Sequence, residues 1–547
     1  MTGRPGQRFT ARMAISAAGE RAPVGVHVDF YASVDTEITR SDHLLGTVLI
    51  VPCLNGLALV TLRCTFSTGI PPGTYYVGWM IDPGNVENET NEGNNTAYNA
   101  SSLLTVVDAP LRPVIYVDAD ARGADDGSSW EDAFESLQDA LAAASIGCEI
   151  RMAEGVYSPD QGMGAVPGDR GATFELKDGV KIVGGYAGAG TPDPDVRNPA
   201  IYRTILSGDL KGDDRPVADP LDLWIEASRM DNSRHVVTAL NVGSQTVLDG
   251  LRIVGGYADG RFENAAPEDS QGAGLYIAGG GPRLQGCLFA GNWAACSGGA
   301  VYMADSNPVF LQCTSCENAA GASPNICRGA GGAIFSVESD WMLVGCTMSG
   351  NATTGSGGAI AGSGGRLSVA NCCFHANRAS QSAGAIHHIN GKQASLDNCT
   401  IAANRQSPYA GAIVSESSGG YGLSEMYLAN CILWNEDRDL VTWGASAVVA
   451  SYCDIRNGWF EGDNVCLDPK FVDPAGPDGL PGTEDDDLRL QGESPCVDAG
   501  NTDLLPADTA DVDGDGNVLE PLPLDRDGQA RVAGGAVDLG AYETPAR

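Results

Sequence analysis

The sequence predicts an all-β protein: a parallel β-helix that begins with one capping α-helix and follows a small N-terminal β-sandwich. Three observations lead to this prediction. A phrase recurs through the middle of the chain: cysteine, asparagine five residues later, Gly-Gly or Ala-Gly another six on, then alanine and an aliphatic residue. Short alternating apolar runs fill residues 1–108, as in a sandwich. Residues 130–145 place apolar side chains at helical spacing.

The period of the phrase identifies the kind of repeat. Its cysteines follow one another at steps of 22 to 33 residues, and the linking segments vary while the phrase stays constant. Helical repeats would show an apolar period of 3.6 residues, whereas these segments have short apolar runs between glycines and asparagines. A constant kernel with variable loops is typical of a β-helix, because strands must stack in register while loops can grow. The cysteines of the phrase are Cys287, Cys313, Cys346, Cys372, Cys399, Cys431 and Cys453.

Coils of a β-helix lie roughly 4.8 Å apart, so equivalent residues are expected to form ladders along its axis. Stacked amides can bond one another along the axis at a tight turn, and asparagine tolerates the left-handed conformation that such turns need. One apolar ladder is Val301, Ile334, Ile360, Ile386 and Ile413, and a second is Phe289, Met348, Phe374 and Ile401. The amide ladder is Asn292, Asn318, Asn351, Asn377 and Asn404.

The chain has 16 cysteines, most of them in the repeated phrase. Stacked residues point their Cβ atoms in parallel, which is a poor geometry for a disulfide, so we expect the ladder cysteines to be buried thiols that pack as small apolar groups. Two pairs lie off the ladder. Cys316 and Cys327 share one loop, Cys53 and Cys64 flank an expected hairpin, and the sequence leaves both pairings open.

The charge of the chain excludes some partners. There are 33 basic and 70 acidic residues among 547, giving a net charge of −37. Nucleic acid is disfavoured because neutralising phosphates needs clustered basic residues. A polyanionic sugar would also be repelled unless calcium bridged it. No run of about 18 apolar residues is present, so we expect no membrane span.

The β-helix is expected to begin with a cap. Ser129 and Asp132 form a capping-box pattern, and an amphipathic helix over 130–145 would cover the open end of the coils. From there to about residue 475 we expect roughly ten or eleven coils. The apolar stripe of the helix is Trp130, Phe134, Leu137, Leu141 and Ala144.

Residues 1–108 resemble the CARDB family, an immunoglobulin-like module of bacterial extracellular proteins. The family's first strand is missing, and Met1 to Thr10 shows no apolar core of a signal peptide. We therefore expect Met1 to be an internal start, with the signal peptide and the first strand lost. The phrases that carry the likeness are Phe30-Tyr31-Ala32-Ser33, Leu44-Leu45-Gly46, Pro71-Pro72-Gly73-Thr74-Tyr75-Tyr76-Val77-Gly78 and Asn91-Glu92-Gly93-Asn94-Asn95.

Residues 109–475 resemble secreted right-handed parallel β-helix proteins of the pectin-lyase-like superfamily and the repeats of autotransporter passengers, through phrases such as Leu248-Asp249-Gly250 and Phe374-His375-Ala376-Asn377. Residues 476–547, an acidic region expected to close the β-helix, are similar to the choice-of-anchor Q region. Ser494-Pro495-Cys496-Val497-Asp498-Ala499-Gly500 and Val537-Asp538-Leu539-Gly540-Ala541-Tyr542-Glu543 carry that likeness. Together the resemblances imply a bacterial protein that is secreted or held at the cell surface.

Two acidic segments are candidate calcium sites. Asp511, Asp513 and Asp515, followed by Gly516, occupy positions 1, 3, 5 and 6 of a calcium loop, although Leu522 stands where such a loop has glutamate. Glu520, Asp525 or Asp527 would complete the oxygen set. Asp478, Asp485 and Asp487 form the second candidate. A solvated acidic turn is the alternative for both.

A carbohydrate site is expected on one face of the β-helix. Tyr302, Phe335 and His387 each follow an aliphatic ladder residue by one, so they should face outward in a row, and exposed rings can stack on sugar faces. Ordinary surface aromatics are the alternative. Catalysis in this fold needs acids or bases gathered in one groove, and the clean repeats show no such recurring cluster.

We therefore expect a secreted or surface-attached β-helix protein that binds polysaccharide or cell-surface glycan without cleaving it, with Ca²⁺ stabilising its C-terminal part. A polysaccharide lyase or glycoside hydrolase of the same fold is the first alternative, and a structural spacer of the cell envelope is the second.

Overall fold

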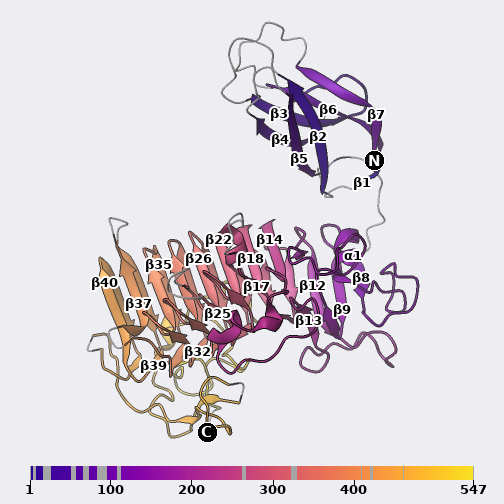
Figure 1. The fold of residues 1–547 in the computed structure, drawn as a ribbon. Coiled ribbons are helices and arrows are strands. Elements are labelled where there is room, and N and C mark those ends of the chain that lie inside the picture. Colours follow the sequence, from indigo (N-terminus) through magenta and orange to yellow (C-terminus); the bar gives the residue numbers. More distant parts are fainter. Residues whose placement is uncertain are drawn as a thin grey trace. The chain divides into compact units, whose positions relative to one another are not determined.

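The computed structural model in Figure 1 describes residues 2–3, 8–16, 26–50, 57–65, 70, 73–82, 95–106, 113–260, 267–321, 329–407, 410–418, 423–459, 461–483 and 485–545. Cys53 and Cys327 lie outside the described residues, and with them the two expected pairings. The chain forms two compact units, Met1–Pro113 and Val114–Arg547. Among the described residues, no helix has the length and apolar character of a membrane span.

The first unit consists of strands in two sheets. In the five-stranded sheet the order is β1-β7-β6-β3-β4, with antiparallel pairing except between β1 and β7, and β2 pairs with β5 in a separate ribbon. Val28, Phe30, Tyr75 and Leu104 form part of its apolar core. Its strands are β1 (Thr2–Gly3), β2 (Arg8–Ser16), β3 (Val26–Ser33), β4 (His43–Ile50), β5 (Leu57–Thr65), β6 (Gly73–Ile81) and β7 (Thr96–Val106).

The second unit is a parallel β-helix whose coils pass through an eleven-stranded, a ten-stranded, a short five-stranded and a nine-stranded sheet in turn. The eleven-stranded sheet contains β8 (Val114–Val117), β9 (Glu149–Ala153), β12 (Lys181–Tyr186), β15 (Val247–Asp249), β19 (Arg283–Gln285), β23 (Val309–Leu311), β27 (Asp340–Val344), β31 (Arg366–Ala370), β35 (Gln393–Asp397), β38 (Ser424–Ala429) and β41 (Ser446–Ser451). The ten-stranded sheet contains β10 (Gly155–Tyr157), β13 (Thr204–Ser207), β16 (Leu251–Val254), β20 (Leu288–Ala290), β24 (Thr314–Cys316), β28 (Thr347–Ser349), β32 (Cys373–His375), β36 (Thr400–Ala402), β39 (Ile432–Trp434) and β42 (Asp454–Ile455).

The remaining two sheets complete each coil. The nine-stranded sheet contains β11 (Phe174–Glu175), β14 (Val237–Val242), β18 (Leu275–Gly280), β22 (Val301–Ser306), β26 (Ile334–Val337), β30 (Ile360–Ser363), β34 (Ile386–Ile389), β37 (Gly411–Ser417) and β40 (Arg438–Gly444). The short sheet contains β17 (Tyr257–Ala258), β21 (Trp293–Ala294), β25 (Ala319–Ala320), β29 (Ala352–Thr353) and β33 (Arg378–Ala379). The expected number of coils agrees with these strand counts.

Strand register confirms both apolar ladders. Val301 pairs with Ile334, and the ladder continues through Ile360 and Ile386 to Ile413. The second ladder also follows the expected order, with Ser315 standing on the rung between Phe289 and Met348. Both ladders point into the core, where the side chains are almost fully buried.

The amide ladder is also confirmed. The backbone N–H and Nδ2 of Asn351 both donate to Oδ1 of Asn377, at 3.1 and 3.0 Å, and the same pair of bonds joins each asparagine to the next. The ladder continues one rung beyond the predicted asparagines, to Asn435, and ends on the carboxylate of Asp439. All of these amides are buried, so each bond replaces one to water.

The left-handed residues of the turns are not the ladder asparagines, which corrects one expectation. Ala376 and Ala403, each directly before a ladder asparagine, have φ of 50° and 53°. At the other corner, Asn371 and Asn398 directly precede a ladder cysteine and have φ of 52°. The ladder asparagines instead stabilise the turns through their side chains.

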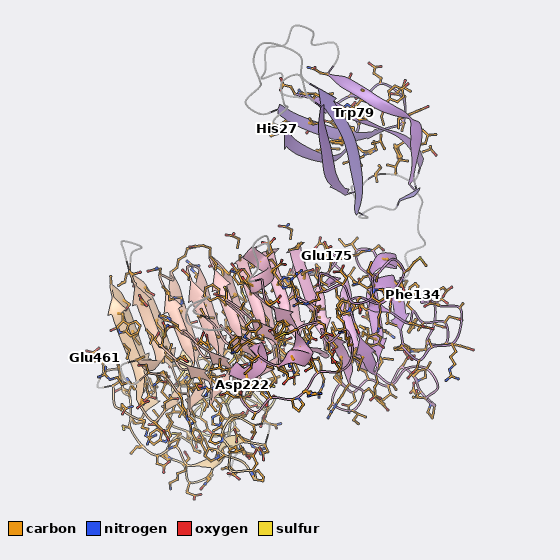
Figure 2. All side chains as sticks on the ribbon, viewed as in Figure 1. His27, Trp79, Phe134, Glu175, Asp222 and Glu461 are labelled. Carbon is orange, nitrogen blue, oxygen red and sulfur yellow. The ribbon has the colours of Figure 1, made fainter. Side chains whose placement is uncertain are left out.

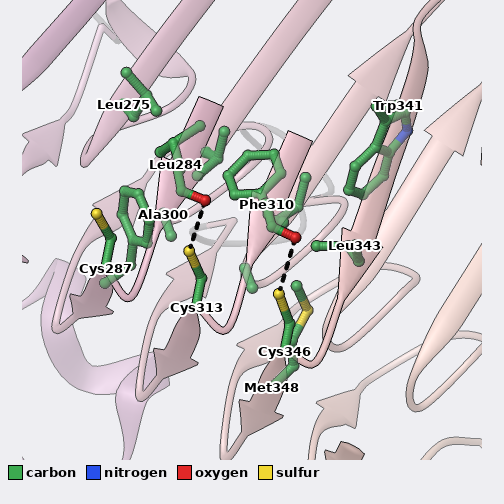
Figure 3. Close-up of a cluster of buried hydrophobic side chains, with 14 of the residues drawn as sticks. Leu275, Leu284, Cys287, Ala300, Phe310, Cys313, Trp341, Leu343, Cys346 and Met348 are labelled. Atoms are coloured by element: carbon green, nitrogen blue, oxygen red, sulfur yellow. Dashed lines mark hydrogen bonds between the residues drawn. The ribbon is translucent and has the colours of Figure 1, made fainter. Parts of the chain in front are cut away.

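The ladder cysteines are buried free thiols, as expected. Figure 3 shows Cys313 donating to the carbonyl of Leu284 and Cys346 donating to that of Phe310, at 3.6 and 3.5 Å. Cys372 is fully buried beside them. The ladder thiols therefore fill space in the core, and those of Cys313 and Cys346 also bond to a strand of the preceding coil.

The capping helix is shorter than predicted: α1 spans Leu137–Ala143, and Ser136 caps its N-terminus by accepting from Asp139 N. Ser129 and Asp132 do bond one another, but they close a turn instead of beginning the helix. Phe134, labelled in Figure 2, packs against the core beside the helix, and the buried face of α1 covers the first coil. Trp130 lies on the outside, against Tyr116 and Tyr186.

The C-terminal segment packs along the flank of the β-helix (Figure 1), whereas we expected it to close the end. Ala510 and Leu522 pack on Leu311 and Val344, because the outer face there is apolar and needs a cover. Trp459 packs against the core of the β-helix. The segment contains one hairpin, β43 (Phe471–Asp473) with β44 (Asp487–Leu490).

The two phrases that resemble the choice-of-anchor Q region have structural roles in this segment. Both carboxylate oxygens of Asp538 accept backbone N–H groups, from Asp498 and Thr544, and Glu543 accepts from Ala533 and Asp538. The fully buried Arg531 donates to the carbonyls of Asp538 and Gly540. These bonds join residues 531–544 to one another and to Asp498. The N–H groups of Gly540 and Ala541 attach this part of the segment to the coils by donating to Asn430 and Thr400.

Candidate functional site

Three aromatic rings form a stack on the outer face of the nine-stranded sheet. Tyr276 and Tyr302 lie 5.4 Å apart between ring centroids with an angle of 10° between their planes, and Tyr302 and Phe335 lie 5.9 Å apart at 17°. His235 adds a tilted ring beyond Tyr276 at 5.4 Å. Because each ring of the stack covers the face of its neighbour, Tyr302 has no free face for a sugar.

The predicted row of exposed rings is therefore wrong in two respects. Tyr302 is 9% exposed and His387 is 5% exposed. His387 is also separated from Phe335 by Ala361, which occupies the intervening rung. Its Nε2 lies 3.0 Å from Glu416 Oε2, and Trp443 meets the ring edge-on at 6.1 Å.

Tyr276 was missed because its coil carries a degenerate copy of the repeated phrase. The segment reads Gly272-Ala273-Gly274-Leu275-Tyr276, with Gly274-Leu275 in place of the usual Ala-aliphatic pair. Aligning this leucine with Val301 would have placed Tyr276 on Tyr302, as the register does.

The predicted calcium loop brings its aspartates together. Oxygens of Asp508, Asp511 and Asp513 lie within 4.8 Å of one another, as do those of Asp513, Asp515 and Glu520. Burial and the neighbouring carboxylates raise the pKa of Asp508 and the pKa of Glu520. Close carboxylates repel one another, and a divalent cation would relieve that repulsion.

The loop itself is held in a curled form. Gly516 N donates to Asp511 Oδ1 at 3.1 Å, and Val512 N donates to the buried Asp508. Asp508 was not expected from the sequence, because it precedes the motif by three residues. Asp525, one of the expected ligands, is used elsewhere and accepts the backbone N–H of Glu543.

The second predicted calcium site does not assemble among the described residues. Asp487 is engaged by Arg489 through two bonds of 2.8 and 2.6 Å, which lower the pKa of that carboxyl. Asp485 accepts from Thr483 Oγ1 and from the backbone N–H of Asp478. The three aspartates therefore serve local turns and an ion pair, and their carboxylates do not form a common cluster.

An open groove of about 490 Å³ runs along the outer face of the eleven-stranded sheet. One row of its floor follows the axis, one residue per coil, and the register pairs each member with the next. That row is Val309, Met342, Ser368 and Ser395, and Tyr427 continues it on the next coil.

The sides of the groove differ. Asp340, Arg366 and Gln393 are exposed along one side, again one per coil. On the other side Val309 and Met342 meet the apolar residues of the C-terminal segment. Arg283 joins the eleven-stranded sheet to the C-terminal segment by donating to the carbonyl of Ala510 at 2.9 Å. The groove was not visible in the sequence, because its residues are ordinary in type and only the register aligns them.

Comparison with known proteins agrees with this architecture. Residues 249–431 match the family described as "Right handed beta helix region". The match covers most of the coils that carry the repeated phrase, and with the long parallel sheets it confirms the predicted right-handed parallel β-helix. A search of curated proteins finds no match.

Two solved structures are similar at low identity. The pectate lyase Pel9A is 15% identical with a TM-score of 0.38, over 79% of this chain and 96% of that one. A pectin methylesterase from carrot is 13% identical with a TM-score of 0.31, over 63% of this chain and 91% of that one. Neither likeness bears on the activity of this protein.

Proposed function

We propose that the protein is a secreted or cell-surface β-helix protein that binds polysaccharide along the groove of its eleven-stranded sheet without cleaving it. The observation behind this proposal is the row of Val309, Met342, Ser368 and Ser395, which repeats one residue per coil. A polymer of repeating units laid along the axis would meet one side chain of this row at each coil, first apolar and then hydroxylated. Apolar floor atoms suit sugar faces, and the hydroxyl and amide groups suit sugar hydroxyls.

Two further features support parts of the proposal. The resemblance of the chain to secreted bacterial β-helix proteins supports its location outside the cell. The carboxylates around Asp513 support a structural Ca²⁺ in the C-terminal segment, whose loop adjoins the apolar side of the groove. The net charge of −37 favours neutral polysaccharides over polyanionic ones.

The test is binding of the whole chain to a panel of neutral and acidic polysaccharides, by affinity electrophoresis and glycan array. Ser368→Tyr fills the groove, and Ser380→Tyr places the same ring on an exposed residue of the same coil outside it. We expect binding by the wild type and the Ser380→Tyr variant, and at least tenfold weaker binding by the Ser368→Tyr variant. Equal binding by both variants would reject the groove as the site.

One observation favours the enzyme as a second candidate. Asp340 and Arg366 are register partners on adjacent coils and line the same groove, where Asp340 Oδ1 accepts the backbone N–H of Arg366 at 2.8 Å, so one acidic and one basic residue belong to this groove. The same polysaccharides should be followed for unsaturated products and for new reducing ends. Turnover that disappears in Arg366→Ala but persists in Arg438→Ala, an exposed arginine outside the groove, would replace the binding proposal with a lyase or hydrolase.

A further inference from the structure

A second open cleft, of about 590 Å³, lies between the outer face of the ten-stranded sheet and the C-terminal segment. Its volume is that of a small-molecule site. Ala402 and Trp434 form part of its wall from β36 and β39, and Phe471 faces them from β43. None of its residues belongs to the groove of the eleven-stranded sheet.

His375 fixes the two walls of this cleft to one another. Its Nδ1 lies 3.2 Å from the carbonyl of Ala402, and its Nε2 lies 3.1 Å from the carbonyl of Pro474 and 2.9 Å from Asp486 Oδ2. The side chains of His375 and Asp486 are 3% and 5% exposed. The C-terminal hairpin is therefore held on the sheet by a buried polar contact, which makes the cleft a preformed feature.

Two cations of the cleft lack an acidic partner. Arg456 lies over the ring of Trp434 at 5.5 Å from its centroid, and its Nη1 donates to the carbonyl of Asn435 at 3.3 Å. Lys470 is exposed and has a φ of 49°, a left-handed conformation that is uncommon for lysine. Within the part of the chain that the structure describes, neither forms an ion pair. Since neither cation is neutralised by an ion pair, both can pair with an anionic group of a ligand in the cleft.

The other polar residues of the cleft limit what that ligand can be. Glu436, Asp468 and Glu493 line it together with Gln491. Carboxylates and amides accept hydrogen bonds from hydroxyl groups, and three carboxylates repel a ligand that carries several negative charges. Trp434 and Phe471 supply apolar surface for the carbon skeleton.

We propose that this cleft binds a sugar acid, that is, a hydroxylated ring of monosaccharide size with a single carboxylate. The carboxylate pairs with Arg456 and Lys470, whose charge-assisted bonds are the strong contacts of the site. The hydroxyl groups bond to Glu436, Glu493 and Gln491. The site is independent of the groove and of whatever binds there.

Isothermal titration of the whole chain with glucuronate, quinate, glucose and citrate tests the proposal. We expect glucuronate and quinate to bind, and glucose and citrate to bind at least tenfold more weakly. Arg456→Gln and Lys470→Gln should each weaken glucuronate binding at least tenfold without changing the melting temperature. Arg438→Gln removes an exposed arginine outside the cleft, and Ser368→Tyr fills the groove. Both should bind glucuronate as the wild type does.

Three results would overturn the proposal. The first is absence of glucuronate and quinate binding to the folded wild type at millimolar concentration. The second is equal affinity for glucose and glucuronate, because the carboxylate would then make no contribution. The third is unchanged glucuronate binding in both Arg456→Gln and Lys470→Gln.

Discussion

The side-chain amide of Asn435 donates to Oδ1 of Asp439 at 2.9 Å, and this contact ends the asparagine ladder. Along the ladder each Nδ2 donates to the Oδ1 of the following coil, so all the amide dipoles point toward Asp439. Aligned hydrogen bonds polarise one another, and the column ends on a carboxylate that accepts without donating. Asn457 bonds the second oxygen of the same carboxylate.

Asp439 should make stability depend on pH. Burial raises the pKa of Asp439 to about 6, against the hydrogen bonds of Asn435 and Asn457, while an unfolded aspartate has a pKa of about 3.9. Its contribution to stability is fully present below about pH 4 and is lost as the pH rises through 6. From pH 4 to 7 the unfolding free energy of the wild type should fall by about 2–3 kcal/mol relative to Asp439→Asn. Parallel denaturant titrations measure this, and Asp437→Asn, an exposed neighbour, should follow the wild type.

Asn377→Ala should be strongly destabilising. The change leaves the N–H and Nδ2 of Asn351 without their acceptor and the Oδ1 of Asn404 without one donor, all in the core. Unpaired buried groups cost about 1–3 kcal/mol each, so we expect a loss of roughly 3 kcal/mol in unfolding free energy. Gln381→Ala removes an exposed amide of the same coil and should change stability by less than about 0.5 kcal/mol. Similar effects of the two substitutions would contradict the role of the ladder.

The cysteines should differ sharply in reactivity. Burial raises the pKa of Cys372 and of Cys431 well above the ordinary value, whereas Cys466 is exposed. The thiolate is the reactive form, so iodoacetamide at pH 8 should label Cys466 and leave the ladder cysteines unlabelled until the protein is denatured. Peptide mass mapping before and after denaturation gives the answer. Native labelling at Cys372 would show that the coils open.

The ladders could be predicted from the sequence because each is a one-dimensional property of the repeat. A fixed spacing from Cys372 to Asn377 and Ile386 sets three positions of the coil. Because the coils stack in register, equivalent residues of successive coils then form the ladders. The same logic fails at Tyr302, where the exposure of an outward residue depends on its neighbours. Tyr276 and Phe335 cover it, and burial by neighbours is not periodic in the sequence.

The groove and the cleft could not be predicted from the sequence, because they too depend on contacts between residues that are far apart in the chain. The cleft depends on the docking of the C-terminal segment, through contacts such as His375 with Asp486, across more than one hundred residues of chain. We expected the same segment at the end of the β-helix. The segment is acidic as a whole, and its composition did not indicate that Ala510 and Leu522 pack on the flank. The grouping of carboxylates in the predicted calcium loop could be anticipated because Asp511, Asp513 and Asp515 are close in sequence, whereas Asp508 was not expected because it lies outside the motif.

Calcium should stabilise the C-terminal segment. Asp513 belongs to both carboxylate groups of the loop, so Asp513→Asn should abolish the effect of the ion. A bound ion at a hundred times its dissociation constant adds about 2.7 kcal/mol, so the melting temperature should rise with Ca²⁺ and fall with a chelator. Asp478→Asn, an exposed acid of the second predicted site, should respond to Ca²⁺ as the wild type does. A wild type indifferent to both Ca²⁺ and the chelator would refute the site.

Tyr302 should contribute to stability and not to sugar binding. Its ring is packed between those of Tyr276 and Phe335 and is 9% exposed, so Tyr302→Ala should lower the unfolding free energy by about 3 kcal/mol, whereas Tyr302→Phe should lower it by less than about 1 kcal/mol. Tyr427→Ala should weaken polysaccharide binding and leave stability nearly unchanged, because that ring is 38% exposed at the end of the groove row. Loss of polysaccharide binding in folded Tyr302→Phe, with none in Tyr427→Ala, would return the sugar site to the nine-stranded sheet.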